Sequence, residues 1–164
     1  MVPADKTLSM KALEARGIPY RLYLFPQSIL DAVGVASHTG LPLEIVYKTL
    51  VVLAVDPPGK KPMLIMVRGD RSLDLKKVAR GVSAKKVRMA HHAEAEKLTG
   101  LKVGGISALV LLSRGFSVFL DQEARTLEEV VVSAGMRGIN LALRVSDLVA
   151  ATQAQWIEAA GETP

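Results

Sequence analysis

The chain has 164 residues, of which 49% are hydrophobic and only 4% aromatic, so its core must be aliphatic. This apolar content excludes an intrinsically disordered chain, and the length predicts one domain over residues 1–164. The 21 basic and 16 acidic residues give a formal charge of +5, which suits a polyanionic partner such as nucleic acid but also an ordinary basic protein.

The sequence contains no cysteine, which excludes a disulfide framework, a thiolate zinc site and a cysteine nucleophile. Residues Met1–Lys11 lack the apolar stretch of a secretory signal. The longest strongly apolar runs, Leu50–Val55 and Ala108–Leu112, are far shorter than the roughly 18 residues that suggest a membrane span. We therefore expect a soluble, cytoplasmic protein with no membrane partner.

The first part of the chain predicts a helix, a strand and a loop. Helical spacing of apolar residues predicts a helix over Thr7–Arg16, with Gly17 just beyond its end. Alternation predicts a strand over Tyr20–Phe25. The glycines and small residues of Ser28–Gly40 favour a loop-rich lid, and Leu43–Tyr47 favours a short helical turn.

A hairpin is the clearest unit of the sequence. Lys48–Asp56 and Pro62–Arg68 are β-rich runs joined by PPGKK, and their nearly continuous apolar character predicts central strands buried on both faces. The pattern then predicts a helix over Ser72–Arg80, capped by Asp74.

The second half continues to alternate between strands and helices. Further elements are predicted at Val87–Met89 (strand), Ala90–Leu98 (helix, ended by Gly100), Phe116–Leu120, Glu129–Ser133 and Gly138–Leu143 (strands), and a C-terminal helix opened by Ser146. Because a hairpin interrupts the alternation, we expect a mixed α/β fold with a largely antiparallel or mixed sheet.

The common nucleophile and nucleotide motifs are absent from the sequence. There is no G-x-S-x-G elbow, Walker A loop or complete G-x-G-x-x-G fingerprint. Ser107 follows a glycine pair but has no base nearby in the sequence, so a hydroxyl that satisfies loop backbone groups is the favoured interpretation.

Histidine offers a weak metal signal. His92 and Glu96 would share a helical face beside His91, but a catalytic zinc needs three protein ligands, and His38 lies far away in the sequence. We therefore predict no metal and a solvated helix start.

Three positions could bind a substrate. Lys48 stands at the entrance of an apolar strand, where a cation can hold a phosphate or an ester oxygen; a lysine reaching out from a strand end is the alternative. The loop Gly104–Ser107 could form an anion-binding nest or be a plain turn, and Ser133–Gly138 is a similar loop that includes Arg137.

A basic set could bind a phosphate backbone, although a solvated helix face is the alternative; it comprises Lys76, Lys77, Arg80, Lys85, Lys86 and Arg88.

The order of these motifs is more specific than any one of them. VYKTL (46–50), DLKKVA (74–79), AKKVRM (84–89), VGGIS (103–107) and VSAGMRG (132–138) follow one another. In this order the chain resembles, over about residues 7–152, the YbaK family of aminoacyl-tRNA editing domains, which are also found inserted in bacterial prolyl-tRNA synthetases.

The resemblance implies a fold and an activity. The fold would be a compact α/β domain with a mixed, partly barrel-like sheet flanked by helices. The activity would be that of a freestanding trans-editing hydrolase that deacylates mischarged tRNA, with Cys-tRNA(Pro) and Ala-tRNA(Pro) as the leading substrates. Its partners would be the acceptor end of aminoacyl-tRNA and, as a further candidate, prolyl-tRNA synthetase. No cofactor is implied.

The resemblance also implies roles for residues. Lys48 would fix the terminal adenosine and the ester, and the backbone of Gly104 and Gly105 would hold the carbonyl as charge develops on its oxygen. The rest of the pocket would be formed by Phe25, Ile106, Ser107, Ala108, Ser133, Gly135, Arg137, Gly138 and Asn140. Water, or the substrate's own thiol, would attack, and Lys76, Lys77, Lys85 and Lys86 would bind the tRNA backbone.

Three positions depart from the family's pattern. Ala108 replaces the loop proline, Phe25 a frequent tyrosine, and Asn140 a common aspartate. The departures at Ala108 and Asn140 keep open the alternative of a catalytically weakened module that binds tRNA or a synthetase. A further alternative, a small metal- or nucleotide-dependent enzyme, rests on His91–His92 and the glycine loops.

Overall fold

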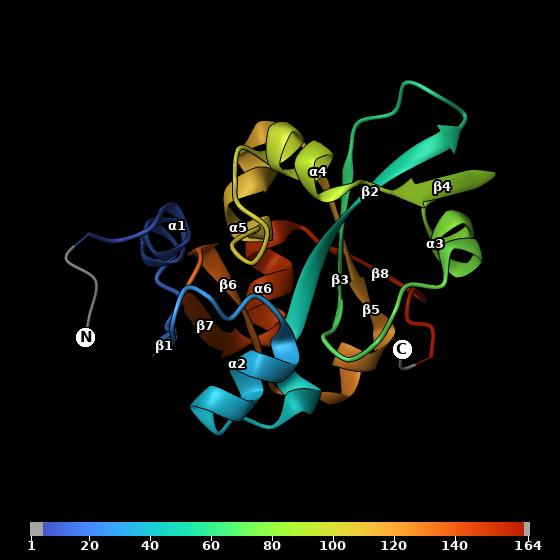
Figure 1. Cartoon of the computed structure of the whole chain (residues 1–164). Coiled ribbons are helices and arrows are strands. Elements are labelled where there is room, and N and C mark those ends of the chain that lie inside the picture. Colours follow the sequence, from blue (N-terminus) through green and yellow to red (C-terminus); the bar gives the residue numbers. More distant parts are fainter. Residues whose placement is uncertain (1–4, 163–164) are drawn as a thin grey trace.

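The computed structural model describes residues 5–162, in which six α-helices surround two β-sheets (Figure 1). Residues 1–4 lie outside this range; they are the first part of Met1–Lys11, the segment in which no secretory signal is expected. The helices are α1 (Leu8–Ala15), α2 (Ala32–Thr39), α3 (Leu75–Gly81), α4 (His92–Thr99), α5 (Ala108–Leu111) and α6 (Val145–Thr152), with 3₁₀ turns η1 (Leu43–Ile45), η2 (Leu112–Arg114) and η3 (Gln122–Thr126). The strands are β1 (Arg21–Leu24), β2 (Tyr47–Asp56), β3 (Met63–Arg68), β4 (Lys86–Met89), β5 (Ser117–Asp121), β6 (Glu129–Met136), β7 (Ile139–Arg144) and β8 (Gln155–Ile157).

The strands form one antiparallel and one mixed sheet. The smaller sheet has the order β1-β7-β6, and the larger has the order β4-β2-β3-β5-β8, with β5 parallel to both β3 and β8. A parallel bridge between Val46 and Val131 joins the two sheets. The mixed α/β class is confirmed, and the described strands close no barrel.

The predicted hairpin forms the centre of the larger sheet. β2 and β3 pair in antiparallel register from Tyr47 opposite Arg68 to Val52 opposite Met63. Residues 63–67 of β3 are all at most 4% exposed, because β3 lies between two strands and packs on both faces. The expectation of a strand buried on both faces is confirmed for β3, whereas β2 becomes exposed at residues 55–56.

Most predicted helix ends agree with the structure. The carboxylate of Asp74 accepts hydrogen bonds from two N–H groups in the first turn of α3, and Gly100 ends α4 in the left-handed conformation with a φ of +72°. The start of α6 was predicted wrongly: Arg144, not Ser146, occupies the N-cap position, and its side chain makes no capping bond.

The predicted loop-rich lid at Ser28–Gly40 is wrong in its second half, which is the helix α2. Asp31 caps the helix, with its Oδ1 accepting from the N–H of Gly34 at 2.7 Å. A Cβ on Gly34 would lie 2.8 Å from that oxygen, and Gly40 ends the helix with a φ of +77°. Both glycines that suggested a loop thus serve the ends of a helix.

The sequence did not predict β8, whose three residues are too few to show alternation. Among the described helices, none combines the length and the apolar character needed to cross a membrane.

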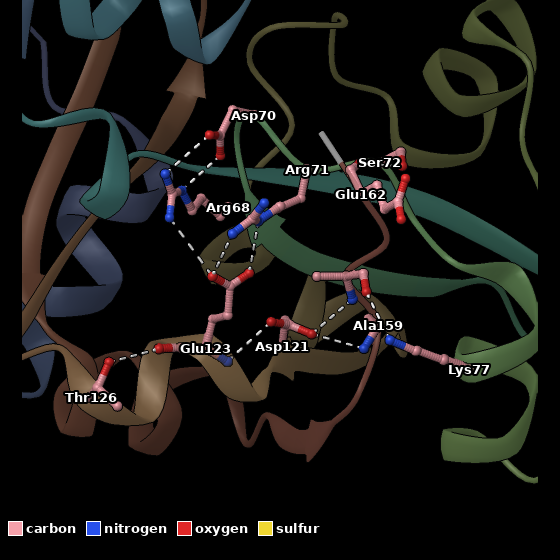
Figure 2. A network of polar contacts seen from close by, with 11 residues as sticks. Arg68, Asp70, Arg71, Ser72, Lys77, Asp121, Glu123, Thr126, Ala159 and Glu162 are labelled. Atoms are coloured by element: carbon pink, nitrogen blue, oxygen red, sulfur yellow. Dashed lines mark hydrogen bonds and ion pairs between the residues drawn. The ribbon is translucent and has the colours of Figure 1, made fainter. Parts of the chain in front are cut away.

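A buried carboxylate fixes this C-terminal segment against the larger sheet (Figure 2). Asp121 is 2% exposed; its Oδ1 accepts from the N–H groups of Ala159 and Ala160 at 2.8 and 2.9 Å, and its Oδ2 accepts from that of Glu123 at 3.0 Å. One side chain therefore both caps η3 and anchors the residues after β8.

Replacing Asp121 with Asn turns one accepting oxygen into an amide donor that faces a backbone N–H. We expect Asp121→Asn to lower the free energy of unfolding by about 1–3 kcal/mol, seen as a lower urea midpoint with an unchanged slope. Glu158→Gln, an exposed acid next to the same segment, is the control. Equal midpoints for the two variants would contradict an anchoring role.

Candidate functional site

A cavity of about 230 Å³ opens between β2, α2, α4 and the loop at residues 101–107. Its walls are mainly apolar and include Phe25, Ile29, Val35, Val46 and Ile106. The polar side chains on its lining include Lys48, Ser133, Asn140, Asp31 and His92. A mostly apolar cavity with a few convergent polar groups is typical of a small-molecule site.

Lys48 brings an ammonium group without a partner to this cavity. It lies near the start of β2 and is half-buried, and its side chain forms no ion pair or hydrogen bond with any residue between 5 and 162. Burial lowers the pKa of its amine from the ordinary value, and the charge of Asp70 partly opposes this effect. The ammonium can therefore bind an anionic or polarised oxygen without first breaking another contact.

Two backbone N–H groups of the glycine loop have no hydrogen-bond partner among the described residues. The N–H of Gly105 donates to the carbonyl of Lys102 at 2.8 Å, whereas those of Gly104 and Ile106 make no hydrogen bond within the described chain. Gly104 and Ile106 line the cavity and Gly105 does not. Gly104 has a φ of +90°, which favours glycine over any residue with a side chain.

A polar clamp holds this loop in place. The N–H of Val103 donates to Glu96 Oε2 at 2.8 Å, and its carbonyl accepts from Arg137 Nε at 2.7 Å. The hydrogen bond from Val103 is the main cause that holds the pKa of Glu96 below its ordinary value. A Cβ on Gly105 would lie 3.0 Å from the backbone nitrogen of Arg137, so glycine also allows the two loops to approach.

The second loop supplies the polar end of the cavity. Ser133 on β6 and Asn140 on β7 are paired across the smaller sheet, and both line the cavity. The Asn140 side chain makes no hydrogen bond within the described residues, so its amide can meet a substrate. Gly135 and Gly138 lie outside the lining; a Cβ on Gly138 would be 2.8 Å from the Phe25 carbonyl.

Comparison with protein families identifies the family of this chain. Residues 27–151 match the aminoacyl-tRNA editing domain, which covers most of the chain. The chain belongs to this family. The recognition made from the ordered motifs is confirmed, as is membership of a family of aminoacyl-tRNA deacylases.

Individual relatives support this assignment. The editing domain is 34% identical to the Enterococcus faecalis protein named "Putative Cys-tRNA(Pro)/Cys-tRNA(Cys) deacylase EbsC", over 94% of this chain and 93% of that one. It is 28% identical to proline–tRNA ligase of Stenotrophomonas maltophilia, over 66% of this chain but only 19% of the ligase.

Solved structures share the fold. The crystal structure of the hypothetical protein APE2540 has a TM-score of 0.83 at 24% identity, with 94% of this chain and 99% of that one covered. A structure described as "a putative trans-editing enzyme for prolyl tRNA synthetase" has a TM-score of 0.78 at 26% identity, with 94% and 96% covered.

Two residues predicted to bind substrate lie behind the cavity of the editing domain. Ser107 is 1% exposed, and its hydroxyl is 2.9 Å from that of Ser9 on α1. Ala108 is buried and is the first residue of α5, a position where proline would cost no helical hydrogen bond. Neither lines the cavity, and Arg137 lines only an adjoining outer hollow.

The region around His91 and His92 is not arranged as a metal site. His92 lines the cavity, but the nearby carboxylate Glu94 is paired with Arg88. Arg88 donates to both oxygens of Glu94 at 2.8 Å and holds the pKa of that carboxyl at about 2. Within residues 5–162, no three His, Cys, Asp or Glu side chains gather as metal ligands would.

The predicted tRNA-contacting lysines lie away from the cavity. Lys76 and Lys77 are on α3, and Lys85 and Lys86 are at the start of β4, the edge strand of the larger sheet (Figure 1). Lys77 is tied to the Ala160 carbonyl at 3.4 Å, and the other three are exposed.

Sequence reasoning missed Asp31 and Asp70. Asp31 is the carboxylate on the cavity lining, and its position before a helix was hidden because the segment was interpreted as a loop. Asp70 acts electrostatically on Lys48 from the end of the neighbouring strand. The acidic residue three positions after the apolar run 63–67 was the available signal.

Substitutions in the buried serine pair test whether Ser107 has a structural or a nucleophilic role. We expect Ser107→Ala to leave the Ser9 hydroxyl unpaired and to lower the free energy of unfolding by about 1–3 kcal/mol, with turnover near that of the parent chain. The double variant Ser9→Ala/Ser107→Ala should lose less than the sum of the single losses. Denaturation and deacylation assays measure both; a collapse of turnover with unchanged stability would contradict this role.

Proposed function

We propose that this editing domain is a freestanding deacylase that hydrolyses mischarged tRNA(Pro) carrying a small amino acid, with cysteine first and alanine second. The observation that carries the proposal is the Lys48 ammonium, which has no partner among residues 5–162, in a cavity also lined by Gly104 and Ile106, whose N–H groups make no hydrogen bond within the same residues. The name of the E. faecalis relative supports cysteine.

The cavity provides a complementary group for each part of the ester. The ammonium of Lys48 binds the phosphate or the ester oxygen of the terminal nucleotide, and the carboxylate of Asp31 faces the α-ammonium of the amino acid. Asn140 and Ser133 contact the amino-acid side chain at the polar end.

The reaction needs no protein nucleophile. Water, or the thiol of a cysteinyl substrate, attacks the carbonyl carbon, and the N–H groups of Gly104 and Ile106 stabilise the oxyanion that forms. With water, collapse of this intermediate breaks the carbon–oxygen ester bond; the ribose oxygen takes up a proton, and free amino acid and tRNA leave. With the thiol, a cyclic thiolactone leaves and later hydrolyses. The enzyme contributes positioning and electrostatic stabilisation.

The basic edge supplies a separate surface for the tRNA body. Lys85 and Lys86 are exposed, and Lys60 of the β2–β3 connection approaches the same region, donating to the Ser83 carbonyl at 3.4 Å. Such a cluster contributes sequence-independent affinity for phosphates. Prolyl-tRNA synthetase is the proposed source of the substrate; in support, the proline–tRNA ligase of S. maltophilia contains a segment similar to this chain.

The decisive experiment compares hydrolysis of Cys-, Ala-, Ser- and Pro-tRNA(Pro). We expect selective loss of one mischarged species, and Lys48→Ala should slow it about a hundredfold or more because an oxygen-binding cation is lost. Lys11→Ala, on the exposed face of α1, is the control and should behave like the parent chain. If every ester decays at the buffer rate in the parent chain, the module that binds without hydrolysing is the better description.

The basic edge is tested by salt dependence. Lys85→Ala/Lys86→Ala should raise KM with kcat unchanged and reduce the slope of log(kcat/KM) against log salt by about one to two. The double variant Lys11→Ala/Arg16→Ala, which also removes two exposed positive charges, controls for net charge. An unchanged salt slope would remove this surface from the tRNA interface.

A further inference from the structure

Two exposed apolar side chains, Leu30 and Met89, belong to the lining of the cavity. They are 46% and 40% exposed, whereas the other apolar side chains of the lining are buried or partly buried. The remaining large apolar side chains that are exposed within residues 5–162 lie outside the lining. Because Leu30 and Met89 face both solvent and the cavity, they form an apolar rim at its mouth.

Leu30 lies directly against the glycine loop. It belongs to the segment before α2, and a Cβ on Gly104 would be 2.9 Å from Leu30 Cδ2 and 3.5 Å from Leu30 Cα. Leu30 also lines the outer hollow that adjoins the cavity. A substrate whose carbonyl oxygen meets the N–H of Gly104 therefore has the Leu30 side chain beside it, on the way out to solvent.

Met89 comes from a different wall and is fixed to β2. It ends β4, where it pairs with Val52, and the N–H of the next residue, Ala90, donates to the carbonyl of Val51 at 3.0 Å. Val51 and Val52 follow Lys48 by three and four residues, which is roughly 10–13 Å along a strand. A nucleoside joined to its ester spans such a distance, so a ligand held at Lys48 can reach Met89.

Basic residues precede Met89 in the chain. Lys85 and Lys86 are exposed at the start of β4, which is an edge strand of the larger sheet. Cations therefore come first along this edge, and an apolar side chain comes last, at the cavity. This order complements the 3′ end of a nucleic acid, in which phosphates precede a final base that carries no further phosphate.

We infer that Leu30 and Met89 form the binding surface for the base of the terminal adenosine and thereby position the ester at Lys48 and Gly104. The inference rests on the proposed function, in which the amino acid enters the cavity and the base stays at its mouth. An adenine ring has apolar faces that the rim can cover, with a gain of hydrophobic free energy. The unbranched methionine side chain adapts to such a flat surface.

Binding of adenosine 5′-monophosphate tests the rim without any hydrolysis. The full chain is labelled with ¹³C at its methionine methyl groups, and Met89→Leu identifies the signal of Met89. We expect a saturable upfield shift of this signal as the nucleotide is added, because an aromatic ring covers the methyl group. Met136, which is 51% exposed but outside the lining, is the internal control and should not shift. A lack of deacylation by the parent chain leaves this measurement intact.

Two further titrations separate the base from the phosphate. Ribose 5-phosphate carries the same sugar and phosphate without the base and should leave the Met89 signal in place. Leu30→Ala should weaken nucleotide binding several-fold by removing the other half of the rim. An unchanged Met89 signal with adenosine 5′-monophosphate, or an equal shift with ribose 5-phosphate, overturns the inference.

Deacylation supplies a second test, in which the base and Met89 are removed separately and together. The substrate is a short acceptor-end RNA that carries cysteine, with or without its terminal base. Loss of the base should raise KM about three- to tenfold, the size expected when some 30–50 Å² of apolar contact is lost. Met89→Ala should raise KM similarly for the complete RNA but little for the RNA without the base.

The control variant is Leu8→Ala, whose side chain is 64% exposed on α1 and outside the lining. It should behave like the parent chain on both RNAs. A merely structural defect in Met89→Ala would raise KM equally for the two RNAs, and that result would overturn the inference. The nucleotide titration of the parent chain decides alone if Met89→Ala does not fold.

Discussion

The antiparallel pairing of β2 with β3 is the constraint on which the rest of the structure depends. The pairing buries the five apolar residues 63–67 of β3 at the centre of the larger sheet. The same register places the start of β2, which contains Lys48, next to the end of β3. β3 ends at Arg68, and Asp70 lies two residues beyond it. The stability of the core and the electrostatics of the site therefore come from one hairpin. A shift of the register by one residue would turn Lys48 to the other face of the sheet.

In the proposed reaction, the backbone of the glycine loop binds the substrate oxygen, and side chains elsewhere hold this backbone in place. Glu96 and Arg137 engage the two polar backbone groups of Val103, and Gly105 closes a turn onto Lys102. These contacts leave the N–H groups of Gly104 and Ile106 as the free donors. Donors that are already fixed need not reorganise when charge develops on a substrate oxygen. Charged residues outside the cavity thus serve chemistry inside it.

The sequence predicted the elements whose signals are local. Apolar runs identified the central hairpin, and Asp74 and Gly100 marked the ends of helices through their own backbone preferences. The prediction failed where a signal was ambiguous or short. Gly34 weakens a helix by propensity, yet it stands in the first turn of α2, where Asp31 needs its N–H and the space that a Cβ would fill. The three residues of β8 carry no periodicity.

The candidate site was predicted in part for the same reason. Motif order brought Lys48, Gly104 and Asn140 together, and all three line one cavity. Motif order could not separate residues that line the cavity from residues that support it. Ser107 and Arg137 lie in the same motifs, but tertiary contacts with Ser9 and Val103 turn them away from it. The pairing of Arg68 with Asp70 depends on side-chain orientation, which the sequence does not encode locally.

The bridge between Val46 and Val131 joins the two sheets, and the cavity lies at this junction, lined by residues of both sheets. Lys48 belongs to the larger sheet and Asn140 to the smaller, so the width of the cavity depends on how closely the sheets approach. Val46, Val131 and Ala142 pack there at no more than 2% exposure, together with small residues of α2. An added methylene group in this close-packed junction would push the two sheets apart and move the walls of the cavity. Under the proposed function, the amino acid that fits the cavity therefore depends partly on Val131 and Ala142, which do not line it.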